Sequence, residues 1–193
     1  RLEAQADAVL AAGETLEAVL KRMARTGQRL TLPQVTAIVK GLLEALVYAH
    51  GHIDAHGNSD PVIHRDIKPG NVMLEPTGRP VLTDFGIAKM KSTEPLTRTG
   101  GVVGTVEYMS PEQILGLEVS PASDLYSFGI MLYRMLTGSV PFPQTTELGT
   151  EAMDGHRHRA PSPLQDRRQD CPAALAEVVR GCLEKEPSKR FQS

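Results

Sequence analysis

Several residue types and patterns are scarce or missing in this 193-residue sequence. Tryptophan is absent, all aromatic residues together make up 4%, and the only cysteines are Cys171 and Cys182. Two cysteines do not make a disulfide framework, which predicts a reducing compartment. Lys and Arg number 21 against 23 Asp and Glu, for a net charge of -2, and this balance argues against a nucleic-acid binder that depends on a basic surface.

Targeting and membrane signals are missing as well. No apolar run approaches the ~20 residues that span a bilayer, and the opening RLEAQADAVL is not a signal peptide. A cytoplasmic location is therefore predicted, with no membrane segment within this chain. A transmembrane segment of the parent protein would have to lie outside this sequence.

The chain is long enough for one domain with a hydrophobic core, and 40% of its residues are hydrophobic. Apolar residues recur at helical spacing over 16–23 and again over 35–47. Thr31 with Gln34 matches a capping box and Pro33 suits a first helical turn. Two amphipathic helices are predicted here, and the second needs a large apolar partner.

Short runs typical of strands occur next, at 62–63, 72–74 and 81–82. The turn-forming stretch 75–80 separates the last two runs and predicts a small hairpin. Residues 51–61 are polar and rich in turn formers, which predicts a loop.

The second half of the chain begins with a long segment, 86–111, that has no hydrophobic period. A long loop inside a compact domain is usually functional. Ser123 or Asp124 is then expected to cap a helix that ends at Gly138. Because that helix is apolar on nearly all sides, it should be buried.

The remaining segments are predicted to have structural roles and no catalytic or metal-binding function. A brief helix is predicted near 147–153, and His156 and His158, flanked by arginines, are expected in a solvated loop rather than a metal site. A final helix over 175–183 places Cys182 on its apolar face, so this thiol should be buried and inert.

The residues that carry chemistry are concentrated in HRDIKPGN, residues 64–71, and in an Asp-Phe-Gly triplet that begins at Asp84. Phosphoryl transfer asks a protein mainly for positioning and charge neutralisation. Asp66 can orient an acceptor hydroxyl and accept its proton, and Lys68 can reach a γ-phosphate. Asn71 and Asp84 supply the hard oxygen ligands that Mg²⁺ prefers.

These motifs resemble the catalytic loop and metal-binding triplet of protein kinases. Residues 104–112 (GTVEYMSPE) are similar to the end of the kinase activation segment, and 124–129 (DLYSFG) to the start of the central buried helix. Residues 185–190 (KEPSKR) are similar to the closing arginine motif. In order and type, the motifs look closest to the eukaryotic-like Ser/Thr protein kinases of bacteria.

The resemblance implies an α+β fold, namely the mainly α-helical C-terminal lobe of the kinase-like fold with a small β-hairpin. It implies one partial catalytic domain over 1–193, with a divergent hinge region at 1–12 and the activation segment at 84–112. The N-terminal lobe is absent, because the sequence contains no glycine-rich phosphate loop and no Val-Ala-x-Lys strand. Taken alone, the chain is expected to be inactive and to expose an apolar face around Val72, Met73, Leu74 and Phe85.

The resemblance also implies a function, the transfer of the γ-phosphate of ATP to Ser or Thr hydroxyls of protein substrates, with Mg²⁺. Thr105 should complete the acceptor site by hydrogen-bonding Asp66 and Lys68, and Met73 should underlie the adenine. The implied site residues are Asp66, Lys68, Asn71 and Thr105 for catalysis, Lys68, Met73, Glu14 and Asp84 for ATP, and Asn71 and Asp84 for the metal.

Structural roles are implied for three further residues. Asp124 should accept hydrogen bonds from the catalytic-loop backbone near His64 and Arg65. Glu112 and Arg190 should form a buried ion pair, and breaking one side of such a pair is costly.

Regulation is implied by Arg65, a buried cation beside the catalytic carboxylate that a phosphate would stabilise. Thr97 and Thr99 of the activation segment are the candidate phosphorylation sites. A kinase homodimer for trans-autophosphorylation is a possible partner arrangement.

Two alternatives stay open. One is a pseudokinase, or a scaffold or binding module, that keeps the fold without catalysis. The other is a small-molecule phosphotransferase with the same HxDxxxxN loop. Ser-Pro-Glu at 110–112 and the threonine-rich loop argue against the second alternative.

Overall fold

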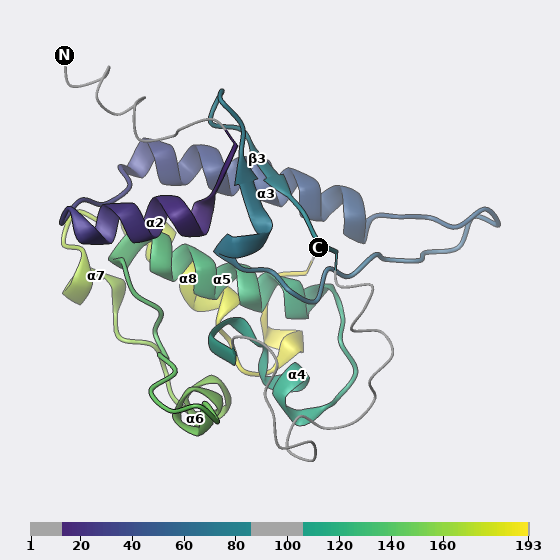
Figure 1. Ribbon diagram of the computed structural model, residues 1–193. Helices are drawn as coiled ribbons and strands as arrows, with labels where there is room; N and C mark the ends of the chain where they lie inside the picture. Colours follow the sequence, from purple (N-terminus) through teal and green to yellow (C-terminus); the bar gives the residue numbers. More distant parts are fainter. Residues whose placement is uncertain (1–12, 86–105, 193) are drawn as a thin grey trace.

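The computed structural model describes residues 13–85 and 106–192. Helices predominate, and a small antiparallel sheet lies at one end of the helical body (Figure 1), which confirms the α+β class. The 3₁₀ helices are labelled η. In chain order the elements are β1 (Glu14–Thr15), α2 (Leu16–Arg25), α3 (Leu32–His50), η1 (Pro69–Asn71), β2 (Val72–Leu74), β3 (Pro80–Leu82), η3 (Val106–Tyr108), α4 (Pro111–Leu115), α5 (Pro121–Thr137), α6 (Thr150–His158), α7 (Leu164–Arg167), α8 (Ala173–Cys182) and η4 (Pro187–Lys189).

Helices α2 and α3 form where the periodicity predicts them. Thr15 caps α2 by accepting from the Ala18 backbone N–H. At α3 the capping box is complete, because the Thr31 hydroxyl accepts from Gln34 N–H and the Gln34 side chain accepts from Thr31 N–H.

Helix α5 is the centre of the core and packs against α8, α3, η3 and α7 (Figure 1). Nearly all of its residues are buried, as predicted. At Gly129 an added Cβ would lie 2.6 Å from Cys182 Cβ, so glycine allows the close approach of α8. The helix ends at Gly138, whose φ of 87° gives the expected left-handed cap.

The prediction that Ser123 or Asp124 caps α5 is wrong. The N-cap is Ser120, and Pro121 occupies the first helical position, where its missing N–H costs nothing. The Ser123 hydroxyl accepts from Ser120 N–H at 3.1 Å. Asp124 therefore lies inside the first turn and is free to bind backbone elsewhere.

The predicted hairpin is confirmed as β2 and β3, which pair antiparallel with Met73 opposite Val81. The third strand, β1, adds to β2 and was not predicted, because two residues show no periodicity. The run 62–63 is not a strand.

Alternation along β2 turns Val72 and Leu74 into the core, where both are fully buried. The expectation that these two side chains form an exposed apolar face is therefore wrong.

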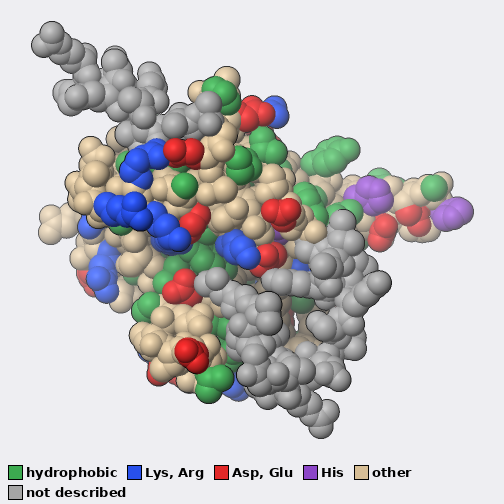
Figure 2. All heavy atoms as spheres, in the orientation of Figure 1, with side chains coloured by type: hydrophobic (Ala, Val, Ile, Leu, Met, Phe, Trp, Pro, Cys, Tyr) green, Lys and Arg blue, Asp and Glu red, His purple; other side chains and the backbone are tan. Residues whose placement is uncertain are grey.

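Residues 51–61 form the expected loop, which projects from the body as a narrow excursion (Figure 1). An isolated bridge joins Ile53 to Ser59, and the Asp54 carboxylate accepts from the backbone N–H of Asn58. Figure 2 shows histidine and acidic side chains along this projection.

Among the described residues, α3 is the one helix that by length and composition could cross a membrane, with a mean hydropathy of 1.3. Core helices of water-soluble proteins pass the same test. Here Val35, Ile38, Leu42 and Leu46 are buried in the core, whereas Val47 and Tyr48 near the end of the helix are exposed.

The C-terminal helices correct one expectation and confirm another. Helix α6 begins at Thr150, later than predicted, and continues to His158. His156 is fully buried on it and not in a solvated loop, whereas His158 is exposed. Cys182 is buried on α8 as expected, and burial raises the pKa of its thiol to about 12.

Candidate active site

The catalytic-loop side chains converge on one carboxylate. The Lys68 ammonium lies 2.8 Å from Asp66 Oδ2, and the Asn71 amide nitrogen donates to the same oxygen at 3.0 Å. The Asn71 amide also donates to the Asp66 backbone carbonyl at 2.8 Å. These side chains come from the turn into η1 and from η1 itself. Lys68 and Asn71, two and five residues after Asp66, are thereby brought into one polar cluster with it.

His64 anchors the start of this loop from within the core. Its ring is fully buried, and Nε2 lies 2.8 Å from the Thr83 carbonyl, so Nε2 carries the proton and donates. Nδ1 then accepts from the Asp66 N–H at 3.3 Å. The Phe85 ring packs on the imidazole with a centroid separation of 4.6 Å. The histidine thereby joins the catalytic loop to the chain that leaves β3.

The Asp124 side chain binds the backbone of the same loop, as the family resemblance implies. Its carboxylate accepts from the backbone N–H groups of His64 and Arg65, each at 2.8 Å. Arg65 has a φ of 67°, a left-handed conformation that is uncommon for a non-glycine residue. Such strain costs on the order of 1–3 kcal/mol and persists only where the surroundings impose it.

Two contacts that sequence reasoning missed support this arrangement. His50, at the end of α3, places Nε2 2.9 Å from Asp124 Oδ2 in a buried pair. The Gln113 side-chain amide, on α4, donates to the Arg65 carbonyl at 2.8 Å. Helix α4 is thus bonded directly to the expected catalytic loop, residues 64–71. Spacing along the chain carries no signal for either contact.

Asp84 is brought to the cluster through backbone pairing. The Thr83 N–H and hydroxyl both donate to the Asn71 carbonyl, at 2.9 and 3.2 Å. Asp84 follows with a φ of 56°, and its side chain is exposed. Aspartate tolerates this left-handed conformation better than most residues.

The oxygen ligands expected for a metal are available at this point. Because the Asn71 amide nitrogen is used by Asp66, its side-chain oxygen is the atom left to ligate, and no hydrogen bond engages that oxygen within 13–85 and 106–192. The Asp84 carboxylate is open to solvent. Within those same ranges no group of three or more His, Cys, Asp or Glu could hold a metal.

Two of the four residues expected to contact ATP, Met73 and Glu14, lie on the sheet. Thr15 pairs with Met73, and Glu14 with Leu74. Met73 is half-buried, on the opposite face of β2 from Leu74. The Glu14 carboxylate is already engaged, because it accepts from Arg22 at 2.5 Å.

Basic side chains gather over α2 beside this sheet (Figure 2). Lys21, Arg22 and Arg25 belong to that helix. The Arg134 guanidinium, on α5, bonds Glu17 at 2.6 Å and the Tyr108 hydroxyl at 2.5 Å. Burial raises the pKa of Tyr108 to about 12, so this hydroxyl keeps its proton.

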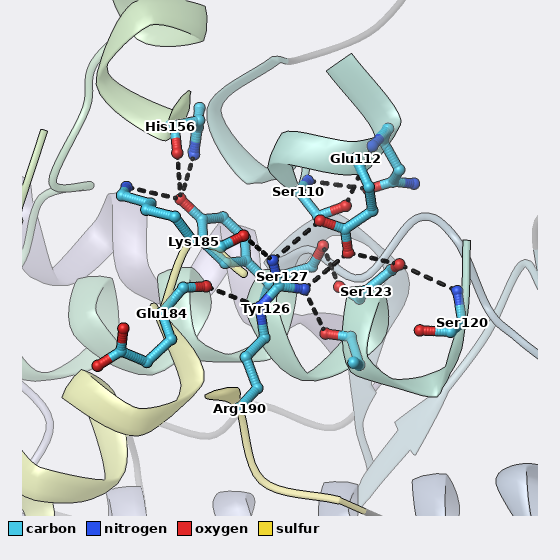
Figure 3. A network of polar contacts seen from close by, with 12 residues as sticks. Ser110, Glu112, Ser120, Ser123, Tyr126, Ser127, His156, Glu184, Lys185 and Arg190 are labelled. Carbon is cyan, nitrogen blue, oxygen red and sulfur yellow. Dashed lines mark hydrogen bonds and ion pairs between the residues drawn. The ribbon is translucent and has the colours of Figure 1, made fainter. Parts of the chain in front are cut away.

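The expected ion pair of Glu112 and Arg190 is present and buried. The guanidinium donates to both carboxylate oxygens, at 2.6 and 2.9 Å, and Ser123 donates to one of them at 2.6 Å (Figure 3). Burial raises the pKa of the Glu112 carboxyl, but the hydrogen bonds from Arg190 and Ser123 outweigh it and hold this pKa below its ordinary value. The pair fastens α4 to the C-terminal end of the chain.

Some expected residues lie outside the described ones. Thr105, Thr97 and Thr99 fall in 86–105, and the expected hinge region is 1–12. Arg65 is only partly buried, which corrects the expectation of a fully buried cation.

Comparison with known proteins gives this chain a family. A model of the protein kinase domain matches residues 4–193. The chain is 42% identical over 181 residues to the serine/threonine-protein kinase PknA of Mycobacterium tuberculosis (strain H37Rv). It is 39% identical over 186 residues to serine/threonine-protein kinase A of Synechocystis, and 36% identical over 182 residues to a probable serine/threonine-protein kinase of Clostridium acetobutylicum. The chain belongs to the protein kinase family.

Each of these alignments covers 94% of the chain but only part of the relative. The covered share is 38% of PknA, 34% of the Synechocystis kinase and 26% of the Clostridium kinase. The chain thus spans less than two fifths of the length of the curated relatives it matches.

Proposed function

We propose that this chain is the C-terminal-lobe part of a Ser/Thr protein kinase that transfers the γ-phosphate of ATP to protein hydroxyls. The cluster of Asp66, Lys68 and Asn71 carries this proposal, with Asp84 joined to it through Thr83. Its geometry assembles a proton acceptor, a cation and two oxygen ligands, which is what phosphoryl transfer requires.

The chain's own residues divide the work. Asp66 orients the acceptor hydroxyl and takes its proton, and the Asn71 amide holds that carboxylate in place. Lys68 lies beside Asp66 and, when ATP is bound, supplies positive charge to the transferring phosphate. The left-handed backbone at Arg65, held by Asp124, keeps the loop in this shape.

Mg²⁺ fits the donor set, since a carboxylate and an amide oxygen are hard ligands of the kind it prefers beside phosphates. Asn71 and Asp84 would hold it, and it would neutralise charge on the β- and γ-phosphates. Met73, from the half-exposed face of β2, would contact the adenine. Glu14 would contact the ribose only if its carboxylate shared or left its ion pair with Arg22.

Several finer assignments belong to the same proposal. Thr105 would complete the acceptor site, and phosphate on Thr97 or Thr99 would pair with Arg65. The proposal includes protein substrates with Ser or Thr acceptors and a kinase homodimer as the arrangement for trans-autophosphorylation. It also includes a cytoplasmic location, which rests on the cysteine usage and the missing targeting signals and not on the kinase function. A lobe that covers the nucleotide would lie outside these 193 residues, with 1–193 as one partial domain, 1–12 as hinge and 84–112 as activation segment. The chain by itself would then be inactive.

A pseudokinase or scaffold is the alternative function, because the fold can persist without catalysis. Two substitutions in the full-length protein separate the possibilities. Asp66→Asn should lower phosphate transfer at least about 100-fold, the usual scale of general-base catalysis, and leave ATP binding intact. Asp84→Asn should instead weaken Mg²⁺-dependent ATP binding, because it removes a formal ligand charge.

The measurements are transfer of labelled γ-phosphate to a generic basic protein and titration of ATP with and without Mg²⁺. A wild-type protein that binds ATP but transfers no phosphate would favour the pseudokinase. Near-normal turnover by Asp66→Asn would contradict the role of that carboxylate.

A further inference from the structure

A buried polar chain joins α5, α6 and the residues that follow α8 (Figure 3). The Tyr126 hydroxyl, on α5, lies 3.0 Å from His156 Nδ1, on α6. The Lys185 ammonium, which follows α8, lies 3.4 Å from the same hydroxyl and donates to the Gly155 carbonyl at 3.1 Å. None of these side chains belongs to the catalytic cluster around Asp66.

The direction of this chain follows from the protonation states. Burial lowers the pKa of Lys185 to about 8, so its ammonium is still charged at pH 7 and must donate. Burial raises the pKa of Tyr126 far above its ordinary value, so its hydroxyl keeps a proton. Burial, with Lys185 nearby, lowers the pKa of His156 to about 3, and the ring is neutral. Lys185 therefore donates to Tyr126, and Tyr126 donates to His156 Nδ1 at 3.0 Å, with the His156 backbone carbonyl as a longer second acceptor at 3.4 Å.

Ring contacts fix the imidazole in one orientation. Phe142 and Tyr126 both meet it edge to face, with centroid separations of 5.2 and 5.7 Å. His156 is fully buried. Its Nε2 has no hydrogen bond of ordinary geometry within the part of the chain that the structure describes, but the backbone of Val106 and Glu107 lies close enough to act on the pKa of the ring.

Helix α6 is also the support on which η3 rests. At Gly149, the N-cap of α6, an added Cβ would lie 2.5 Å from Val106 Cγ2, so only glycine permits this approach. The Glu107 carboxylate accepts from the Gln144 N–H just before the helix. The backbone of Val106 and Glu107 acts on the pKa of His156, which places the imidazole next to η3.

A shift of η3 would change the position of the acceptor site, because both neighbours of η3 in the chain are connected to that site. Residue 105, the expected acceptor-site threonine, directly precedes η3. Helix α4 follows it, and Gln113 on that helix bonds the Arg65 carbonyl beside Asp66. The position of α6 therefore bears on the surface that a protein substrate meets, more than on the nucleotide side of the cluster.

We propose that His156 is a positioning residue for protein substrates, an inference that rests on the proposed kinase function. By accepting the Tyr126 hydroxyl, the imidazole holds α6 against α5, and α6 in turn holds η3. Losing the acceptor should loosen recognition of the protein substrate and leave the chemistry and ATP binding unchanged.

The test uses the full-length protein, ATP and myelin basic protein as a generic acceptor. His156→Leu removes the Nδ1 acceptor, Tyr126→Phe removes the hydroxyl that donates to it and accepts from Lys185, and His156→Asn keeps an acceptor near the Nδ1 position. A hydrogen bond of about 1 kcal/mol corresponds to about fivefold in binding. We expect KM for the protein acceptor to rise about fivefold for His156→Leu and Tyr126→Phe, no further for the double variant, and to return toward wild type for His156→Asn.

The controls separate positioning from general damage. KM for ATP and kcat should stay within about twofold in all variants, and His158→Leu, at an exposed position on the same helix, should behave as wild type. If Tyr126→Phe, the mildest change, leaves KM for the acceptor unaltered, or if kcat and both KM values change together, the role of His156 is overturned. A wild-type protein with no phosphate transfer overturns the kinase function itself, and this role with it.

Discussion

At the residue scale, each buried charge in the described part of the structure has a specific partner. The Asp124 carboxylate accepts hydrogen bonds from two backbone N–H groups and pairs with the His50 imidazole. The Arg190 guanidinium donates to the Glu112 carboxylate and also to the backbone carbonyls of Ala122, Glu184 and Lys185. A buried pair contributes little net stability against an apolar alternative, but removal of one partner leaves an uncompensated charge.

Arg190→Met should therefore destabilise the chain by about 3–5 kcal/mol, because it strands the Glu112 carboxylate in the core. Equilibrium unfolding in urea, followed by circular dichroism, measures this change. The neighbouring Lys189→Met is the matched control, since Lys189 pairs with Glu186 at the surface and its loss should change little. A loss below about 1 kcal/mol for Arg190→Met would mean that the pair is not desolvated as the structure indicates.

At the scale of elements, caps set where helices begin, and the apolar faces decide where they pack. Helix α3 starts at a complete capping box, and α5 starts at Ser120 followed by Pro121. Left-handed residues then end or bend the chain, with Gly138 after α5 and Arg65 in the catalytic loop. Glycine adopts this conformation freely, whereas Arg65 needs the hydrogen bonds from its surroundings.

Thr31→Ala should destabilise the chain by about 1 kcal/mol, because the first-turn N–H of Gln34 loses its acceptor. Thermal and urea unfolding both report this loss. Thr36→Ala, one turn into the same helix, is the control: Thr36 bonds only the Leu32 carbonyl, and alanine is the better helix former there. Equal destabilisation by the two variants would contradict the capping role.

At the scale of the whole molecule, stability depends on keeping His156 neutral. Burial is the main cause of its lowered pKa, and the nearby charges of Lys185 and Arg159 lower it further. An unfolded histidine titrates near pH 6.5. Between about pH 6.5 and 3, the unfolded chain therefore binds a proton at this residue that the folded chain does not, and stability falls as the pH falls.

Between pH 7 and 5 this linkage should remove about 2 kcal/mol from the free energy of unfolding. Urea unfolding at a series of pH values measures it. In His156→Asn the same loss should disappear, and His158→Asn, at an exposed position, should keep the wild-type profile. Parallel profiles for wild type and His156→Asn would show that the buried imidazole does not control the acid sensitivity.

Local signals were sufficient for much of the fold. Helical periodicity and the capping pattern located α2 and α3, and the turn 75–80 located the hairpin. The failures have a common cause. The two-residue strand β1 is too short to show a hydrophobic period. Both Ser120 and Ser123 can cap a helix, and Pro121, which suits the first helical position, makes Ser120 the N-cap of α5.

The chemical identity of the candidate site was determined by the sequence itself, because residues 64–71 and Asp84 supply the expected catalytic groups that the geometry brings together. Only the tertiary structure decided how these groups are held. His50, Gln113 and His156 bond residues 30 to 74 positions away. No local pattern encodes such pairings, because they arise when helices pack and bring buried polar groups together.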